Sequence, residues 1–185
     1  MYPLNLDYTC GICRNKRLPY SELYVYGPYA GKLRDLLIAL KFRNQFWVSQ
    51  VISDLLIKDE RFANFISGAD LLLPVPLHSR RLDSRGFNQV YLFTKEFKKR
   101  LSLSIPISKW DVLRVKETEF QKSLSLRRRI LNLRKAFMIN NISAIQGKKI
   151  ILIDDILTTG ATVMSVSKLL RKSGAKEIKV VIIAR

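Results

Sequence analysis

The sequence has few of the residues and patterns on which several large classes of protein depend. It contains two cysteines and one histidine among 185 residues, so a complete four-ligand zinc site within the chain is not predicted. No apolar run approaches the ~18 residues of a membrane span. The first residues, Met-Tyr-Pro-Leu-Asn-Leu-Asp-Tyr, lack the basic region and apolar block of a signal peptide. These absences predict a cytoplasmic protein without a membrane span.

Acidic residues are also scarce relative to basic ones. The chain has 15 Asp and Glu residues against 33 Lys and Arg residues, a net charge of +18. Such a charge says little about the fold but indicates polyanionic partners, either a polyphosphate, a nucleic acid or both. A Lys-rich, high-pI proteome would produce the same imbalance. The sequence leaves both explanations open until the charge is shown to cluster.

A nucleoside-triphosphate P-loop is absent as well, because no Gly-x-x-x-x-Gly-Lys-Ser/Thr run occurs. A different strand-turn-helix run lies between Ile150 and Thr162. Four large apolar residues predict a strand that is buried on both faces and ends in Asp154 and Asp155. A Thr-Thr-Gly-Ala-Thr turn follows, and apolar residues then recur at helical spacing, at Val163, Val166 and Leu170.

This run has the chemistry of a site for a phosphorylated sugar. Backbone N–H groups in a small-residue turn and at a helix N-terminus point towards an anion, and Gly160 permits close approach. Thr158, Thr159 and Thr162 add hydroxyl donors. A carboxylate accepts two hydroxyl hydrogen bonds, so the acids suit a sugar 2,3-diol beside a 5-phosphate. The alternative, an acidic strand end followed by an N-capping threonine, leaves the Thr-Thr-Gly-Ala-Thr run unexplained.

The same run resembles the signature of type I phosphoribosyltransferases, which bind phosphoribosyl pyrophosphate (PRPP). The resemblance implies that Asp154 and Asp155 are catalytic residues that bind the ribose diol. It implies that the PRPP 5-phosphate is held by the loop Leu157, Thr158, Thr159, Gly160, Ala161 and Thr162. A Mg²⁺ ion on the pyrophosphate of PRPP would share the stabilisation of this leaving group.

A basic segment follows the earlier apolar run Leu71–Leu73, which Pro74 and Pro76 end. Arginine forks bind phosphate in a bidentate manner, and open α/β sheets hold ligands at the carboxyl ends of their strands. In phosphoribosyltransferases the corresponding loop holds pyrophosphate, which implies this catalytic role for Arg80, Arg81 and Arg85. A solvated basic loop is the alternative, and His78 is interpreted as a structural or rim residue.

Two further stretches carry candidate contacts. The segment from Arg114 to Gln121 occupies the position of a mobile lid in related enzymes, which implies lid contacts from Arg114, Lys116, Thr118 and Gln121. The next stretch, flanked by Phe120 and Phe137, combines charge and aromatic residues as single-strand binders do. Its candidate nucleic-acid contacts are Lys122, Arg127, Arg128, Arg129, Arg134 and Lys135. A solvated basic helix with Leu124, Ile130 and Leu131 packed inward is the alternative.

A narrower resemblance covers almost the whole chain from about residue 9. The motifs that carry it are Tyr29-x-Gly31-x-Leu33-Arg34 leading to Lys41-Phe42, Pro74-Val75-Pro76, Arg85-Gly86-Phe87-Asn88-Gln89, Leu113-x-x-x-x-Thr118-x-x-Gln121-x-x-Leu124, Arg129-x-x-Asn132 and Ala136-Phe137. Together they resemble the ComF (ComFC/GntX) family. The resemblance implies a type I phosphoribosyltransferase fold behind a four-cysteine zinc ribbon. It also implies a role in natural competence, in which a helicase-like partner and the protein act on incoming single-stranded DNA at the inner face of the membrane.

The sequence departs from the family in its cysteines. Cys10 and Cys13 match the second knuckle of the zinc ribbon, and the first knuckle is missing. Either the true start lies upstream of Met1, or this lineage has lost the Zn²⁺ ion. The predicted organisation is an irregular N-terminal segment over residues 1–28, with a possible short strand at 24–26, and an α/β domain over residues 29–185. Within that domain a mainly parallel sheet is flanked by helices, including helices near 31–42, 46–57 and 87–101 and an extended piece at 112–115.

Two functions follow from these expectations. The enzyme hypothesis is transfer of ribose 5-phosphate from PRPP to a nitrogen nucleophile with release of pyrophosphate, in nucleotide or nucleobase metabolism or on nucleic acid. The sequence supplies no recognisable acceptor site, however. The second hypothesis is therefore a non-catalytic PRPP sensor that regulates the handling of single-stranded DNA.

Overall fold

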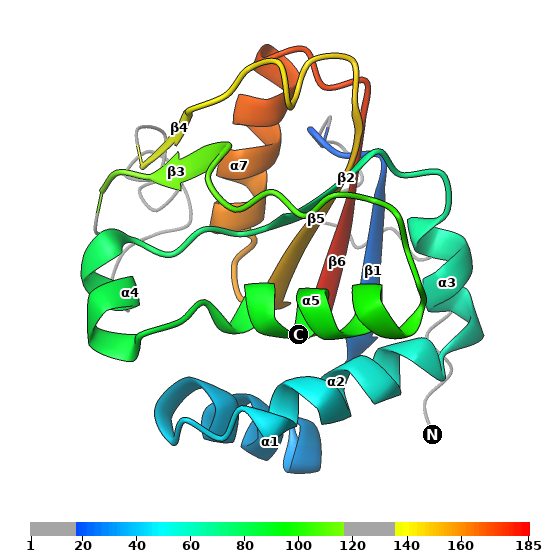
Figure 1. The fold of residues 1–185 in the computed structure, drawn as a ribbon, viewed down its shortest axis with the longest axis vertical. Helices are drawn as coiled ribbons and strands as arrows, with labels where there is room; N and C mark the ends of the chain where they lie inside the picture. The colour runs from blue at the N-terminus through cyan, green and yellow to red at the C-terminus, as the bar shows by residue number, and fades with distance from the viewer. Residues whose placement is uncertain (1–17, 117–135) are drawn as a thin grey trace.

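The computed structural model describes residues 18–116 and 136–185. Its centre is a parallel sheet whose described strands lie in the order β1-β6-β5-β2 (Figure 1). Parallel strands need crossover connections, and helices occupy these connections here. The mainly parallel sheet that the sequence predicts is therefore confirmed. Its strands are β1 (Glu22–Gly27), β2 (Leu71–Pro74), β5 (Lys149–Ile156) and β6 (Glu177–Ala184).

Helices cover both faces of this sheet, because its central strands are apolar on both sides. On one face, Ile151 and Ile153 of β5 pack in a buried cluster with several helices. On the other face, Ile150 and Leu152 pack in a second cluster with α7 (Ala161–Lys172). The helices of the first face are α1 (Gly31–Phe42), α2 (Trp47–Ile57), α3 (Glu60–Ile66) and α5 (Gln89–Arg100).

The basic segment after β2 is a helix rather than the predicted loop. Residues Ser79–Arg85 form α4, which ends at Gly86 in the left-handed conformation with φ of 77°. None of the α4 residues is buried, so no apolar periodicity marks the helix in the sequence. Because α4 lies between β2 and α5 in the chain, its basic side chains follow the carboxyl end of β2 and precede the start of α5.

The N-terminal segment contributes a strand to the sheet. Residues Glu22–Gly27 form β1, which pairs in parallel with β6, and Tyr24 of this strand is buried. The boundary expected at residue 28 therefore falls between β1 and α1, inside the folded domain. Partner strands more than 150 residues away decide this placement, so no local pattern reveals it. Cys10 and Cys13 of the expected zinc-ribbon remnant lie outside the described residues.

A small antiparallel sheet lies beside the main one. It pairs β3 (Val112–Arg114) with β4 (Phe137–Ile139), with Leu113 opposite Met138. The extended piece predicted at 112–115 is confirmed, whereas β4 was not predicted.

The helices are short compared with the thickness of a bilayer. A spanning helix needs about 20 apolar residues. The longest helices that the described part of the chain forms have 12 residues, and none of them qualifies as a membrane span.

The first cluster predicts a large cost for removing a ring at its centre. Phe97 of α5 is fully buried and contacts the ring of Phe62 edge-on at 5.1 Å between centroids. We expect Phe97→Ala to lower the free energy of unfolding by roughly 3–5 kcal/mol, because it leaves a cavity. Urea denaturation measures the change. Ile142→Ala, at a side chain that is 58% exposed, is the control and should change it by less than about 0.5 kcal/mol. Equal effects of the two substitutions would contradict this account of the core.

Candidate functional site

The candidate site lies where the carboxyl ends of the central strands meet the start of α7. Asp154 and Asp155 belong to the last part of β5, and the loop of residues 157–160 leads from this strand into α7. In open parallel sheets this edge is where ligands bind, because loops and helix N-termini converge there. The order of strand, acids, small-residue loop and helix is the one that the sequence predicts.

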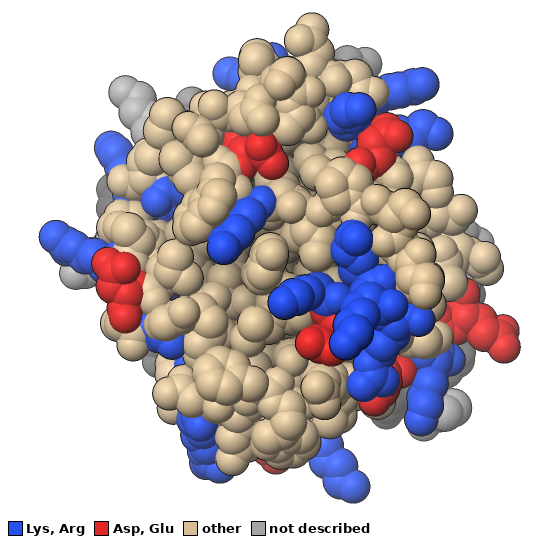
Figure 2. Space-filling model, in the orientation of Figure 1, with Lys and Arg blue, Asp and Glu red and all other residues tan. Residues whose placement is uncertain are grey.

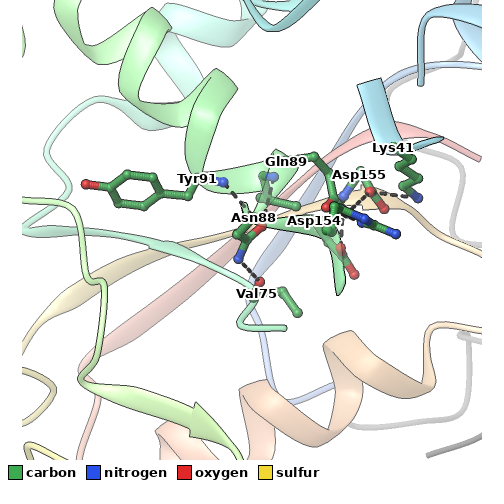
Figure 3. A network of polar contacts seen from close by, with 9 residues as sticks. Lys41, Val75, Asn88, Gln89, Tyr91, Asp154 and Asp155 are labelled. Carbon is green, nitrogen blue, oxygen red and sulfur yellow. Dashed lines mark hydrogen bonds and ion pairs between the residues drawn. The ribbon is translucent and has the colours of Figure 1, made fainter. Parts of the chain in front are cut away.

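Asp155 is an internal group of the folded protein. Asp155 is 5% exposed. Its Oδ2 accepts a hydrogen bond of 2.6 Å from Gln89 Nε2 and forms an ion pair with Lys41 Nζ at 2.7 Å (Figure 3). Lys41 lies near the end of α1, and Gln89 is the first residue of α5. A buried carboxylate is stable only when it is paired and hydrogen-bonded, and these two helices supply its partners.

Arg85 extends this network to α4. Its Nη1 donates a hydrogen bond of 2.5 Å to Gln89 Oε1, so Gln89 connects the arginine to Asp155. Burial lowers the pKa of the Arg85 guanidinium, an effect that the carboxylate of Asp155 opposes and the charge of Arg81 reinforces. A row of polar contacts thus runs from α4 through α5 and β5 to α1.

Asp154 has different surroundings. Successive side chains of a strand point to opposite faces, so the Asp154 side chain leaves β5 on the side opposite to Lys41 and Gln89 (Figure 3). Its Oδ1 accepts a hydrogen bond of 2.9 Å from the N–H of Asp155. The pKa of Asp154 is raised to about 7, first by burial and then by the charge of Asp155, while the backbone hydrogen bond and the charges of Lys41 and Arg114 oppose the shift.

The two acids are therefore not equivalent. The sequence places both at the end of the strand, but the strand continues to Ile156, so its pleat separates them. Asp155 is engaged by Lys41 and Gln89, whereas Asp154 is partly exposed beside the loop. A single carboxylate can accept both hydroxyls of a vicinal diol, and in this geometry Asp154 is the acid placed to do so.

The loop between β5 and α7 has the geometry of an anion site. Gly160 adopts a positive φ of 72°, which favours glycine, and its carbonyl accepts the first helical bond, from Met164 N–H. Thr158 and Thr159 are exposed, and Thr159 Oγ1 accepts a hydrogen bond of 3.4 Å from Ala161 N–H. The first N–H groups of a helix have no partner within it and favour an anion.

The neighbouring loop residues hold the loop in place. Leu157 donates its N–H to Ala184 O at 2.9 Å, and its side chain packs against the second buried cluster. Ala161 is buried at 5% exposure, and Thr162 is partly buried. Of the six predicted loop residues, the two exposed threonines are thus the ones that offer hydroxyls to solvent.

The structure distributes the other predicted residues unevenly. Arg81 and Arg85 are partly buried one helical turn apart, and Arg80 is exposed on a different side of α4. Arg114 of β3 forms a backbone bridge with His78, and its charge acts on Asp154. Lys116 is exposed beyond β3. The candidates outside the described residues are Cys10, Cys13, Thr118, Gln121, Lys122, Arg127, Arg128, Arg129, Arg134 and Lys135.

Sequence reasoning assigned no site role to Lys41 or Gln89. Both residues appear there only as parts of the motifs that carry the family resemblance. A signal for Gln89 was available in the sequence, because it precedes the apolar stripe of α5 directly after the N-capping Asn88. A polar residue in that position faces the core with its neighbours, and Gln89 is 4% exposed.

The raised pKa of Asp154 predicts that the free energy of unfolding decreases as the pH rises. Because the folded-state pKa of about 7 exceeds the ordinary value of 3.8, the native protein binds this proton more tightly than the unfolded chain. The contribution is complete below pH 4 and is lost as the pH rises to about 7. Asp154→Asn should flatten the pH dependence of the unfolding free energy across this window. Asp59→Asn is the control, because Arg61 lowers the pKa of Asp59 to about 2 and its effect should appear only below pH 4. An unchanged slope in Asp154→Asn would refute the assignment.

The buried pair of Lys41 and Asp155 predicts non-additive substitutions. Lys41→Met should lower the free energy of unfolding by about 3–5 kcal/mol, because it leaves a buried carboxylate without its cation. Adding Asp155→Asn should restore part of this loss, since the uncompensated charge is then removed. Arg34→Met breaks the exposed pair of Arg34 with Asp35 and should cost less than about 1 kcal/mol. A double variant as unstable as Lys41→Met alone would show that charge burial is not the cause.

Comparisons with known proteins agree with this architecture. A profile of the phosphoribosyl transferase domain matches residues 96–185. Competence protein F of Haemophilus influenzae is 34% identical over 180 residues, covering 95% of this chain and 78% of that protein. The DNA utilization protein YhgH of Escherichia coli strain K12 is 33% identical over 177 residues, covering 92% of this chain and 75% of that protein.

Solved structures of phosphoribosyltransferases are more distant. A hypoxanthine phosphoribosyltransferase from Staphylococcus aureus aligns with a TM-score of 0.45 and 19% identity over 72% of this chain and 61% of that one. An adenine phosphoribosyltransferase from Leishmania donovani aligns with a TM-score of 0.45 and 19% identity over 86% and 69%. The sequence relatives decide the assignment: the chain belongs to the competence protein F family, and its fold is that of a type I phosphoribosyltransferase domain.

Proposed function

We propose that this protein binds PRPP and acts in natural competence, in the cytoplasm, on incoming single-stranded DNA. The observation that carries the proposal is the partly exposed carboxylate of Asp154 beside the threonine loop at the N-terminus of α7. Membership of the family that contains competence protein F and the DNA utilization protein YhgH supports the biological role.

Each end of PRPP has a candidate partner. The 5-phosphate binds the N–H groups of the loop and of the α7 N-terminus, with Thr158 and Thr159 as additional donors. The two hydroxyls of the ribose diol donate hydrogen bonds to the carboxylate of Asp154. Because a protonated acid cannot accept both hydroxyls as well as a carboxylate does, binding favours ionised Asp154 and strengthens as the pH rises through 7. Asp155 contributes by holding Lys41 and Gln89 in place.

The pyrophosphate group needs positive charge. Arg81 and Arg85 of α4 supply it from one side, and Arg114 and Lys116 supply it from β3 and the residue pair that follows. Arg80 is exposed on another side of α4 and adds to the positive charge of this helix. The Arg85 guanidinium is already fixed by Gln89, so it can meet the anion without being ordered first.

The described residues fit a Mg²⁺ ion that arrives with PRPP rather than a resident metal. Among residues 18–116 and 136–185, no three acidic, histidine or cysteine side chains gather into a metal cluster. Mg²⁺ commonly keeps several waters and is held by one or two carboxylates plus substrate phosphates, and Asp154 can supply one such carboxylate. When bound, the ion would neutralise charge that develops on departing pyrophosphate.

The DNA role is supported by clustering of positive charge. On the face shown in Figure 2, basic side chains gather over the C-terminal part of α5, whose last turn contains Lys98, Lys99 and Arg100. A basic surface supplies the sequence-independent part of nucleic-acid binding. The proposal also includes a helicase-like partner at the inner face of the membrane. The protein would associate with that membrane peripherally.

The second candidate function is catalysis, which the match to the phosphoribosyl transferase domain favours. Ribose 5-phosphate would pass from PRPP to a nitrogen nucleophile, with the bond from the anomeric carbon to pyrophosphate breaking and a new carbon–nitrogen bond forming. Release of pyrophosphate that depends on an acceptor supports this candidate, with purines, pyrimidines, ammonia and nucleic acid as acceptors. PRPP binding without turnover on any of these acceptors supports the sensor.

The binding proposal predicts thermal stabilisation by PRPP. PRPP with Mg²⁺ should raise the melting temperature, because a ligand that binds only the native state stabilises it. At a concentration 100 times the dissociation constant, the gain is about 2.7 kcal/mol. Differential scanning fluorimetry at pH 6 and pH 8 measures the shift, which should be larger at pH 8. Asp154→Asn should abolish most of the shift and its pH dependence.

A matched control separates the site from general charge effects. Asp83→Asn removes an exposed carboxylate from α4 and should leave the PRPP shift intact. Absence of a shift in the wild-type protein at saturating PRPP would remove the proposed site. A shift that Asp154→Asn leaves unchanged would move the ribose contact elsewhere.

A further inference from the structure

Three aromatic side chains are exposed together where α1 ends and α2 begins. Phe42 is 71% exposed, Phe46 is 51% exposed and Trp47 is 56% exposed. Large apolar side chains are normally covered, and a group of them on one surface marks an interaction site. We name these three residues the aromatic ledge. Of the residues assigned to the candidate PRPP site, Arg85 lies over one of these rings, that of Phe42.

The ledge is supported from below. The ring of Phe46 packs edge-on against Phe87 with centroids 4.8 Å apart, and the residue after Trp47, Val48, is fully buried. Asn44 between the two helices has a positive φ of 52°, which fixes a tight turn. Rings held on a fixed turn lose little conformational entropy when a partner stacks on them.

Positive charge borders the ledge on more than one side. The Arg85 guanidinium carbon lies 5.6 Å from the centroid of the Phe42 ring, and Arg43 is exposed next to it in the chain. Lys41 precedes Phe42 directly. Aromatic rings interleaved with cations bind single-stranded nucleic acid, because unpaired bases stack on the rings while phosphates contact the cations.

The ledge also lies next to the candidate PRPP site. One guanidinium, that of Arg85, is placed over Phe42 and donates to Gln89, which in turn donates to Asp155. A strand stacked on the ledge would therefore lie beside the pyrophosphate end of bound PRPP. On these observations we infer that the aromatic ledge is a stacking surface for single-stranded DNA, an inference that rests on the proposed function and names the surface which the DNA contacts.

Charge complementarity favours a nucleic-acid strand as the occupant. A strand offers both bases for the three rings and phosphates for Arg43 and Arg85. An anionic membrane would also attract aromatic and basic side chains, so vesicles form a separate arm of the test.

The test measures binding of a fluorescently labelled oligodeoxythymidine to the full chain by anisotropy. Phe42→Ala and Trp47→Ala should each weaken binding by about fivefold or more, as expected when one base loses its stacking partner. Trp110→Ala is the matched control, because this ring is 54% exposed and belongs to a different segment, so binding should stay within about twofold of wild type. Arg43→Gln should lower the slope of log affinity against log salt by about 0.7.

A second measurement reports on the ledge directly. The chain has two tryptophans, so Trp110→Phe leaves Trp47 as the single indole, and its emission should be quenched as oligodeoxythymidine binds. Vesicles of phosphatidylserine and phosphatidylcholine form the other arm and should leave this emission unchanged. The PRPP shift in melting temperature should persist in Trp47→Ala, which leaves the contact of Arg85 with Phe42 in place, and this separates failure of the ledge from failure of the PRPP site.

Several outcomes would overturn the inference. Oligonucleotide binding that is unchanged in both ledge variants, or weakened equally by Trp110→Ala, removes the ledge as the DNA surface. Absence of oligonucleotide binding at low salt also rejects it, and vesicle binding in its place would identify the ledge as a membrane contact. If PRPP fails to stabilise the wild type while the ledge variants still lose DNA affinity, the ledge stands and the proposed PRPP site falls.

Discussion

The candidate site depends on one buried charge, the carboxylate of Asp155. An uncompensated charge in this position would be costly, so the fold must bring a cation and an amide to it. Lys41 and Gln89 meet this requirement, and each comes from a different helix. The carboxylate therefore fixes α1 and α5 against β5. Through Gln89 it also fixes Arg85, so the basic helix α4 takes its place from the same constraint.

The pleat of β5 gives its two adjacent acids different properties. Asp155 is engaged internally, whereas Asp154 lies beside the threonine loop with a pKa raised to about 7 by burial and by its neighbour. A group with this pKa changes charge close to neutral pH, so a ligand that donates hydroxyls stabilises the ionised form. The internal pair thus acts on Asp154 in two opposite ways, because the charge of Asp155 raises the pKa of Asp154 and the charge of Lys41 lowers it.

The Asp155 network also connects the candidate site with the exposed aromatic side chains at the end of α1. Competence protein F and the DNA utilization protein YhgH are relatives over most of the chain, and the matching profile is that of a phosphoribosyl transferase domain. Arg85 contacts both the Asp155 network and the ring of Phe42. One partly buried guanidinium thus joins the Asp155 network to the exposed rings at the end of α1.

Prediction from the sequence succeeded where the signal is local. The apolar run before Asp154, the threonine loop and the helices α1, α2 and α7 each occupy one continuous stretch, so composition and periodicity reveal them. The family resemblance, carried by separate motifs, is confirmed by the relatives. The α4 helix was missed, because it buries no side chain and so lacks an apolar period. β1 was left outside the domain, because its partner strand is β6 at the other end of the chain.

The sequence by itself determined which residues form the threonine loop between β5 and α7, because a loop of adjacent residues needs no distant partner to be recognised. Only the tertiary structure decided that Asp155 is a buried anchor and that Asp154 is the partly exposed acid. Gln89 and Asp155 are separated by 66 residues, and the pairing of a buried charge is settled by packing across that distance. The same holds for the aromatic ledge, since exposure is a property of the folded surface and leaves no trace in the order of residues.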